Sequence, residues 1–280
     1  MGLFDKKFCD ICGDKIGLLG NKKLKDGNMC KNCQAKLSPF FHERRESTIE
    51  EIKAQLEYRE KNKEAVAAFR ATTTFGDSMK IYIDEAAKKF LVTRSPINKF
   101  ADANPDVIDF SQVVAFDVSI DEDEDEVRYK NSEGEYKSFT PQRYAYSYNF
   151  EVKLTVQNPY FSEISFNLNE YAIDNEAETS VDYEDLNGIA PEDYKVPGFG
   201  ADKTSNKAEV KNSEEYKKYL KQSEELGAFF GKVKKAEHDN IEAQNKAAEE
   251  EQNTVICPYC GAKTKKGAAG ICEFCGAPLP

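Results

Sequence analysis

The stretch Cys9–Cys33, CDICGDKIGLLGNKKLKDGNMCKNC, contains two CxxC pairs with 17 residues between them. A second set of two CxxC pairs, with 11 residues between them, lies near the other end of the chain. All eight cysteines therefore belong to such pairs. Both thiolates of one pair can reach one ion, and two pairs complete the tetrahedral four-sulfur shell of a structural zinc site. We expect two structural Zn²⁺ sites, whose ligands are Cys9, Cys12, Cys30 and Cys33, and Cys257, Cys260, Cys272 and Cys275.

The residues that follow each pair predict how the chain leaves the metal. Gly13, Gly261 and Gly276 come directly after three of the pairs, and glycine takes a positive φ there at little steric cost. The pair Cys30–Cys33 is followed by Gln34 instead, which favours a short helix over Gln34–Leu37. Asp26-Gly27 is a strong hairpin signal. A knuckle, a hairpin and a ligand at a helix start are the order of a treble-clef-like finger.

Other chemistries of paired cysteines remain as alternatives. Disulfides need an oxidising compartment, whereas Met1–Lys7 is short and has no apolar core, so we expect no secretory signal and a cytoplasmic location. A redox CxxC normally belongs to a βαβ unit that neither end resembles. An iron centre could use the same sulfurs. Catalytic zinc is disfavoured because four thiolates leave no coordination position for water.

Composition and charge limit the partners. The chain has 280 residues, 40% of them hydrophobic, with 14 Tyr and 18 Phe, which is enough for one proper core, and no apolar run approaches the roughly 20 residues of a membrane span. The net charge of −11 is uneven: residues 1–70 sum to +4 and residues 101–200 to −17. Nucleic acid is therefore disfavoured as a partner, except through lysines at the ends. These are Lys22, Lys23 and Lys25, and Lys263, Lys265 and Lys266.

The middle of the chain predicts an α+β fold with an antiparallel sheet. Apolar and aromatic residues alternate with polar ones over Tyr144–Val156, and Ile164–Leu168 repeats the pattern after a turn. Met79–Ile83 and Lys89–Arg94 predict a further hairpin. We interpret the acidic run Asp121–Glu126 as a solvated strand exit; a Ca²⁺-type site is the alternative, but the EF-hand spacing is missing.

Helical patterns separate the remaining segments. Ser47 and Glu50 have capping-box spacing before an amphipathic pattern, and Asn212 with Glu215 opens a second helix. We expect the first to join finger and core, and the second to pack on the sheet. The predicted segments are a finger over 1–42, a linking amphipathic helix over 43–70, a β domain over 71–170, an acidic linker or loop over 171–211, a helix and charged spacer over 212–253, and a zinc ribbon over 254–280.

The stretch CDICGDKIGLLGNKKLKDGNMCKNCQAKLSP resembles an uncharacterised bacterial family that carries this four-cysteine domain at the N-terminus. Ser47–Arg70 and Asn104–Phe116 are also similar to long members of it. The resemblance implies metal ligation by the four finger cysteines and no activity. The order of strands and then a helix resembles pleckstrin-homology-like (PH-like) or GRAM-like β domains, and the tail ICPYCGAKTKKGAAGICEFCGAPLP resembles generic zinc ribbons.

These patterns favour a non-enzymatic zinc-binding adaptor that contacts a protein partner through its zinc modules and its β core. We expect no enzyme, because no GxSxG, HExxH or phosphate-loop motif occurs and His42 and His238 stand in weak contexts. Two alternatives are nucleic-acid binding through the basic ends and membrane-surface recruitment through a PH-like domain. The sequence indicates neither the partner nor the oligomeric state.

Overall fold

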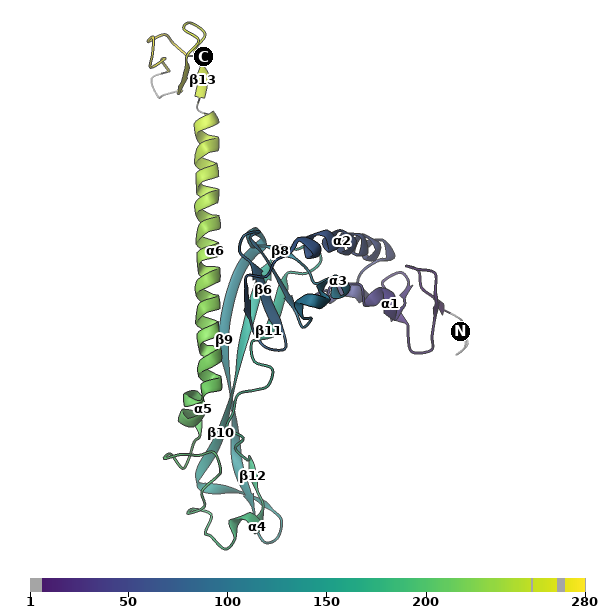
Figure 1. Ribbon diagram of the computed structural model, residues 1–280, viewed down its shortest axis with the longest axis vertical. Coiled ribbons are helices and arrows are strands. Elements are labelled where there is room, and N and C mark those ends of the chain that lie inside the picture. Colours follow the sequence, from purple (N-terminus) through teal and green to yellow (C-terminus); the bar gives the residue numbers. More distant parts are fainter. Residues whose placement is uncertain (1–6, 253, 266–269, 280) are drawn as a thin grey trace. The chain divides into compact units, whose positions relative to one another are not determined.

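The computed structural model describes residues 7–252, 254–265 and 270–279, and side chains up to residue 249 in the long last helix (Figure 1). The chain divides into two compact units, Met1–Ala228 and Phe229–Pro280. Helices and strands are both abundant, so the α+β prediction is confirmed at that level. The six predicted segment boundaries stay predictions.

The finger consists of two small hairpins and one helical turn. Its elements are β1 (Lys7–Phe8), β2 (Lys15–Ile16), β3 (Lys22–Lys23), β4 (Asn28–Met29) and α1 (Lys31–Gln34). β1 pairs with β2, and β3 pairs with β4 across the predicted Asp26-Gly27 turn. The helical turn starts one residue after Cys30, not at Gln34, because Cys30 itself is the N-cap. Leu24, Met29 and Leu37 form the finger's core together with Ile52 of the next helix.

The linking helix α2 (Ile49–Ala68) follows a 3₁₀ turn, η1 (Glu43–Arg45). Its capping box uses Thr48 and Glu51, one residue later than the sequence pattern suggested. The more important difference is the buried face. We expected an apolar stripe, but the buried positions include three polar residues at helical spacing; the full set is Ile52, Gln55, Arg59, Asn62 and Val66. Of these polar residues, Arg59 and Asn62 form hydrogen bonds with other parts of the unit.

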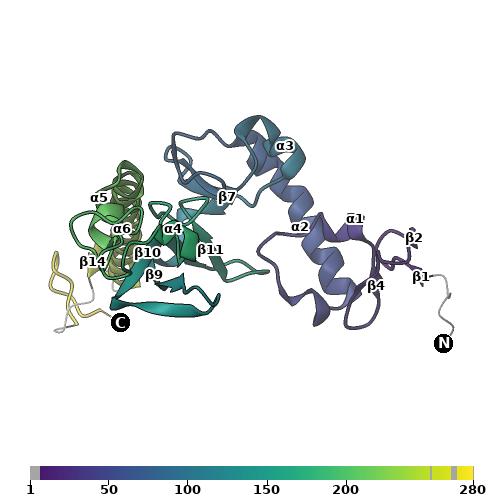
Figure 2. The same ribbon diagram turned by 90° about the horizontal axis from the view of Figure 1, so that it is seen from below.

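The first sheet is an antiparallel meander in the order β5-β6-β7-β8. Its strands are β5 (Thr73–Phe75), β6 (Lys80–Asp84), β7 (Lys89–Thr93) and β8 (Ile108–Asp109). The predicted β6–β7 hairpin is confirmed. Two short turns, η2 (Ile97–Lys99) and α3 (Phe100–Ala103), lie between β7 and β8, and α3 packs along α2 (Figure 2). The turn η3 (Phe110–Gln112) leads into the second sheet.

The second sheet is built on one long hairpin, in the order β11-β10-β9-β12. Its main strands are β9 (Val113–Lys130), β10 (Tyr136–Val156) and β11 (Glu163–Asn167). The predicted return strand is confirmed, since Leu154 pairs with Ile164 and Val152 with Phe166. The acidic run is not a strand exit. It lies inside β9, where Asp121 pairs with Asn149 and Glu126 with Tyr144.

Residues 171–211, expected to be an acidic linker or loop, contain β12 (Ser180–Val181), α4 (Tyr183–Leu186) and α5 (Lys207–Asn212). Val181, Leu186 and Val196 are buried against Val127 and Phe139 of the long hairpin. The Arg143 guanidinium, itself buried, donates to the backbone carbonyls of Tyr194, Pro191 and Glu192. The low periodicity concealed this packing, because the apolar residues are spaced irregularly.

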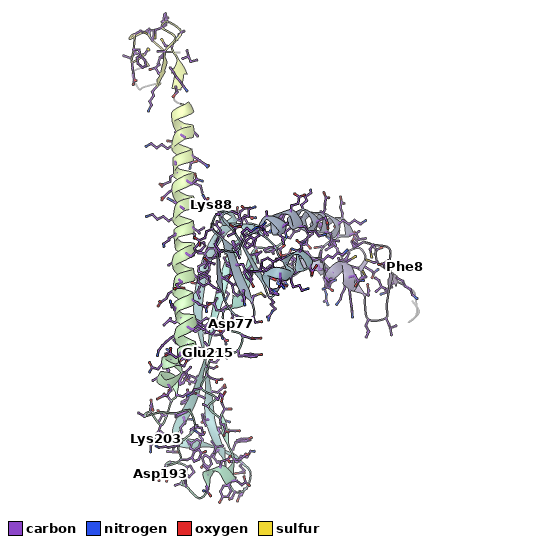
Figure 3. All side chains as sticks on the ribbon, in the orientation of Figure 1. Phe8, Asp77, Lys88, Asp193, Lys203 and Glu215 are labelled. Carbon is purple, nitrogen blue, oxygen red and sulfur yellow. The ribbon has the colours of Figure 1, made fainter. Side chains whose placement is uncertain are left out.

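Helix α6 (Glu214–Gln252) starts after Ser213, whose hydroxyl accepts the Tyr216 N–H at 3.1 Å, rather than at Asn212. Its first part packs on the sheet as expected, with the ring of Tyr216 5.1 Å from that of Tyr148 and 5.3 Å from that of Phe150. Lys218 also pairs with Asp77, which is labelled in Figure 3, at 3.1 Å. No helix among the described residues is long and apolar enough to cross a membrane.

The second unit contains the rest of α6 and the ribbon. Residues 238–249 of the helix are exposed throughout, which fits the predicted charged spacer. The ribbon has one hairpin, β13 (Thr254–Ile256) with β14 (Lys263–Lys265). A bridge between Ile271 and Pro278 closes its second knuckle.

Candidate metal centres

The structure gathers the four finger cysteines into one group. Their sulfur atoms all lie within 4.8 Å of one another. The Cys9 and Cys33 sulfurs are 3.8 Å apart, and those of Cys12 and Cys30 are 3.7 Å apart. Backbone N–H groups point at two of the sulfurs: that of Cys30 donates to Cys9 Sγ at 3.2 Å and that of Cys33 to Cys30 Sγ at 3.4 Å.

The four ribbon cysteines form a second group of the same kind, also within 4.8 Å. The Cys257 and Cys275 sulfurs are 3.6 Å apart, and those of Cys260 and Cys272 are 3.8 Å apart. Cys257 and Cys272 are buried, whereas Cys260 and Cys275 are exposed. The structure therefore gathers the eight cysteines into the same two groups of four that the sequence spacing predicts.

Three knuckles share one backbone pattern. The N–H of the first cysteine of the pair donates to the carbonyl of the residue five positions later. The N–H of the glycine that follows the second cysteine donates to the carbonyl of the first cysteine. Gly13, Gly261 and Gly276 have φ of 80°, 72° and 70°, in the left-handed region that disfavours a Cβ. In the Cys30 knuckle, the Gln34 N–H donates to the Cys30 carbonyl at 3.0 Å and starts α1. The glycines thus predicted three of the exits, whereas the predicted helix over Gln34–Leu37 is the turn Lys31–Gln34 in the structure.

Backbone dipoles make one thiol in each group easier to ionise. Burial opposes ionisation of Cys9, but the N–H groups of Cys12, Cys30 and Ile11 outweigh it and lower its pKa to about 7. The N–H of Cys260 favours the Cys257 thiolate and lowers that pKa to about 7 as well. Burial and the neighbouring sulfurs raise the pKa of Cys33. A cation that replaces the protons on each group removes this repulsion between sulfurs.

The donor set fits zinc. A Zn–S distance of about 2.3 Å in a tetrahedron gives sulfur–sulfur edges of about 3.8 Å. Two sulfur–sulfur distances in each group lie at 3.6–3.8 Å, and all lie within 4.8 Å. A disulfide needs about 2.05 Å, and all eight cysteines are free. Both groups could therefore hold a metal ion in a closed four-sulfur shell. The same geometry suits a single iron ion.

Other candidate ligands lie apart from these groups. His42 is exposed and precedes η1. His238 lies near Asp239 and Glu242 on α6, but all three are exposed, and nothing in their surroundings distinguishes them from an ordinary helix surface. Among the lysines at the two ends of the chain, Lys22 is half-buried and Lys263 is exposed, while Lys266 lies outside the described residues.

One comparison with known proteins bears on this site. Residues 7–55 match the model of a domain of unknown function, DUF4428. The chain carries this domain at its N-terminal end. The match spans the finger and the start of α2, and supports the resemblance to an uncharacterised family for that part. Searches of curated proteins and of solved structures find no match.

Sequence reasoning missed a buried polar network that ties the finger to the β domain. Asp106 accepts hydrogen bonds from Arg59 at 2.5 Å and from Ser38 at 2.8 Å. Arg59 also donates to the Lys36 carbonyl at 3.2 Å. Asn62 donates to the Pro105 carbonyl at 2.7 Å and accepts the Val107 N–H at 3.0 Å. The available signal was the helical spacing of Arg59 and Asn62 together with the NPD turn at 104–106.

Proposed function

We propose that the protein is a non-enzymatic adaptor whose two metal sites are structural zinc sites and whose C-terminal ribbon docks a protein partner. The carrying observation is the ribbon surface: Ile256, Tyr259 and Phe274 are 71%, 71% and 70% exposed. Tyr259 and Phe274 directly precede the second cysteine of their knuckles. Metal binding at both cysteines would hold these rings rigid in water.

Rigid exposed aromatics are suited to protein recognition. An aromatic side chain buries about 150–250 Å² and loses little conformational entropy when it is already fixed. Tyrosine is enriched among residues that dominate binding energy. A closed four-thiolate shell offers no position for a substrate or water, which supports a structural role for the metals. The free thiols also support the expected reducing, cytoplasmic setting.

We further propose that residues 71–228 form a PH-like β core that serves as a second docking element. A four-strand meander, a three-strand meander and a closing helix follow one another in the chain, which supports the resemblance. The N–H of Asp77, after β5, donates to the Leu168 carbonyl, after β11, so the two sheets meet at that corner.

The core also offers an open strand edge. β12 pairs only with Arg128 and Tyr129 of β9, and no backbone hydrogen bond joins the outer edge of Asp117–Glu126 to the described residues. An open edge can accept an extended segment of another protein. The acidic side chains along it favour a segment rich in Lys or Arg.

Affinity purification of the metal-loaded full chain tests the adaptor proposal. We expect a partner that is retained by the wild type and lost with Tyr259→Ser/Phe274→Ser. The matched control is Tyr136→Ser/Tyr171→Ser, which removes two tyrosines that are 55% and 77% exposed elsewhere. The partner is then purified, and its binary affinity is measured by calorimetry. Equal retention by all three proteins, with zinc present by native mass spectrometry, would refute docking through the ribbon.

Nucleic-acid binding is the alternative that Lys263 and Lys265 on β14 support. It requires binding that weakens steeply with salt. A gel shift at low salt with no retardation would remove it. Membrane recruitment has only the PH-like strand order in its favour, and co-sedimentation with anionic vesicles tests it.

A further inference from the structure

A cleft of about 780 Å³ lies where the finger meets the β domain. Its wall comes from the finger, from η1 and from the end of β7 with α3. Four of the side chains around it are basic: Lys22, Lys31, His42 and Arg44. Arg59 also reaches the cleft, but its charge is paired with Asp106. Among the residues that the structure describes, no aspartate or glutamate lines the cleft.

The basic side chains have no counter-charge of their own. Among the described residues, Lys22, Lys31 and Arg44 make no ion pair. Arg44 is held in place by donating to the Lys23 carbonyl. Lys22 and Arg44 are half-buried, so their charges are less screened than those of fully exposed residues. Three uncompensated charges around one cleft stand out in a chain of net charge −11.

We propose that this cleft binds a small solute that carries two or three phosphate groups, such as a polyphosphate or a nucleoside di- or triphosphate. The three positive charges of Lys22, Lys31 and Arg44 match the negative charge of such a solute. Lysine and arginine bind phosphate oxygens through short, charge-assisted hydrogen bonds. The volume lies within the usual range of about 300–1,000 Å³ for small-molecule sites. Leu37 and Phe41 add apolar surface for the rest of the solute.

A competing explanation is that these cations only offset the thiolate charge of the finger. Lys31 is adjacent to Cys30 and fits that role. Lys22 and Arg44 are less readily explained by it, because each is at least eight residues from any cysteine in the sequence. The two explanations differ in what a charge removal changes: phosphate binding in one case and metal retention in the other.

The test uses the zinc-loaded full chain and isothermal titration with inorganic tripolyphosphate and with ADP. We expect saturable one-site binding, weakened at least about tenfold by Lys22→Gln/Arg44→Gln, since two charge-assisted contacts are lost. The matched control, Lys25→Gln/Arg45→Gln, removes the same charge from neighbouring exposed positions and is expected to leave affinity unchanged. Lys22→Arg is expected to retain binding. Zinc content is measured before and after, because polyphosphates chelate zinc.

Each other outcome overturns the proposal. No saturable heat with either probe at millimolar concentration means that there is no such site. Equal weakening by both double variants means diffuse electrostatic attraction. Zinc loss in Lys22→Gln/Arg44→Gln with unchanged phosphate affinity assigns the cations to the metal. Binding only to a single-stranded RNA oligonucleotide, or only to vesicles that contain a phosphoinositide, replaces the small solute with that macromolecular surface. None of these results depends on whether the ribbon docks a protein.

Discussion

The two four-cysteine groups have nearly the same sulfur geometry but very different surroundings. The finger shares a hydrophobic core with α2, in which Leu24, Met29 and Ile52 are fully buried. Its Asp26 side chain accepts the Ile49 N–H at 2.8 Å, and the Lys25 N–H donates to the Ser47 carbonyl at 2.9 Å. In the described part of the ribbon, only Cys257, Thr264 and Cys272 are buried.

This difference in packing indicates how strongly the folding of each module would depend on a bound metal ion. In the finger, the knuckles are part of a larger unit with a hydrophobic core. In the ribbon, the knuckles make up most of the module. A module of about 25 residues without a core cannot offset its conformational entropy and needs a metal to fold. The finger has hydrophobic packing in addition to the metal ion that its cysteines could bind. We therefore expect unequal responses to the same perturbation.

The largest effect is expected from metal removal. Chelation should unfold residues 254–279 completely, because a structural zinc supplies on the order of 10 kcal/mol in such modules. The finger should keep partial protection around Leu24 and Ile52, and the β core should be spared. Hydrogen exchange followed by mass spectrometry measures all three regions in one experiment. Equal loss of protection in finger and ribbon, or a single unfolding step for the whole chain, would contradict the distinction.

The next effect concerns the buried pair that ties the finger to the β domain. Asp106→Ala should cost about 3–5 kcal/mol, because it leaves the Arg59 guanidinium buried without a partner. The double variant Arg59→Met/Asp106→Leu should recover most of this loss. Thermal unfolding of the zinc-loaded protein measures both. A double variant no more stable than the single one would mean that the pair is not the main connection.

Glycine substitutions should separate packing from backbone strain. A Cβ at Gly27 would lie 2.7 Å from Asp10 Oδ2 and 2.7 Å from Ile49 Cδ1, and Asp10 cannot move without losing the Asn28 N–H. Gly27→Ala should therefore cost about 1–3 kcal/mol through overpacking. A Cβ at Gly261 would meet no atom of the described residues within 4 Å, but the φ there is +72°. Gly261→Ala should therefore cost about 1–2 kcal/mol through backbone strain.

Zinc competition with a chromogenic chelator, read at each module in turn, compares these two variants. Gly27→Ala should lower the thermal stability of the first unit with little change in ribbon affinity. Gly261→Ala should lower the zinc affinity of the ribbon and leave the thermal stability of the first unit nearly unchanged. If one module responded equally to both substitutions, the conclusion that the finger and the ribbon are packed independently would be wrong.

The smallest effect is expected at the cap of α2. Thr48→Ala removes the hydroxyl that accepts the Glu51 N–H and should cost about 1 kcal/mol. Because α2 carries Ile52 into the finger core, the finger should lose hydrogen-exchange protection as well. Ser213→Ala at the start of α6 is the matched control and should leave the finger unchanged. A finger insensitive to Thr48→Ala would mean that it does not depend on α2.

The metal groups and the main hairpins could be predicted from the sequence because their signals are local. Four residues define a knuckle, and alternation over Tyr144–Val156 fixes which side chains face the core. Tyr148 and Phe150 are indeed fully buried. A one-residue error in such a strand would reverse its faces, so this pattern carries strong information.

The rest depends on partners far away in the chain. Arg59 and Asn62 have the composition of a solvated helix face, and only the NPD turn, 42 to 47 residues later, gives them a buried role. Glu122 belongs to an acidic run, but Lys207 and Lys211, at 2.5 and 3.6 Å, place it in an ion-pair cluster. The ribbon's exposed aromatics and the basic cleft are properties of assembled surfaces, which no local pattern encodes.

Arg143 has a consequence for how this chain can diverge. Among the described residues, its side-chain hydrogen bonds go to the main-chain oxygens of Pro191, Glu192 and Tyr194. Residues 191–193 can therefore exchange side chains as long as the backbone keeps its path, whereas Tyr194 also stacks on Phe139. Arg143 itself has no substitute, because lysine lacks the planar fork that reaches several acceptors. In a set of relatives, we therefore expect one arginine to persist on the hairpin opposite a segment whose residues drift from species to species.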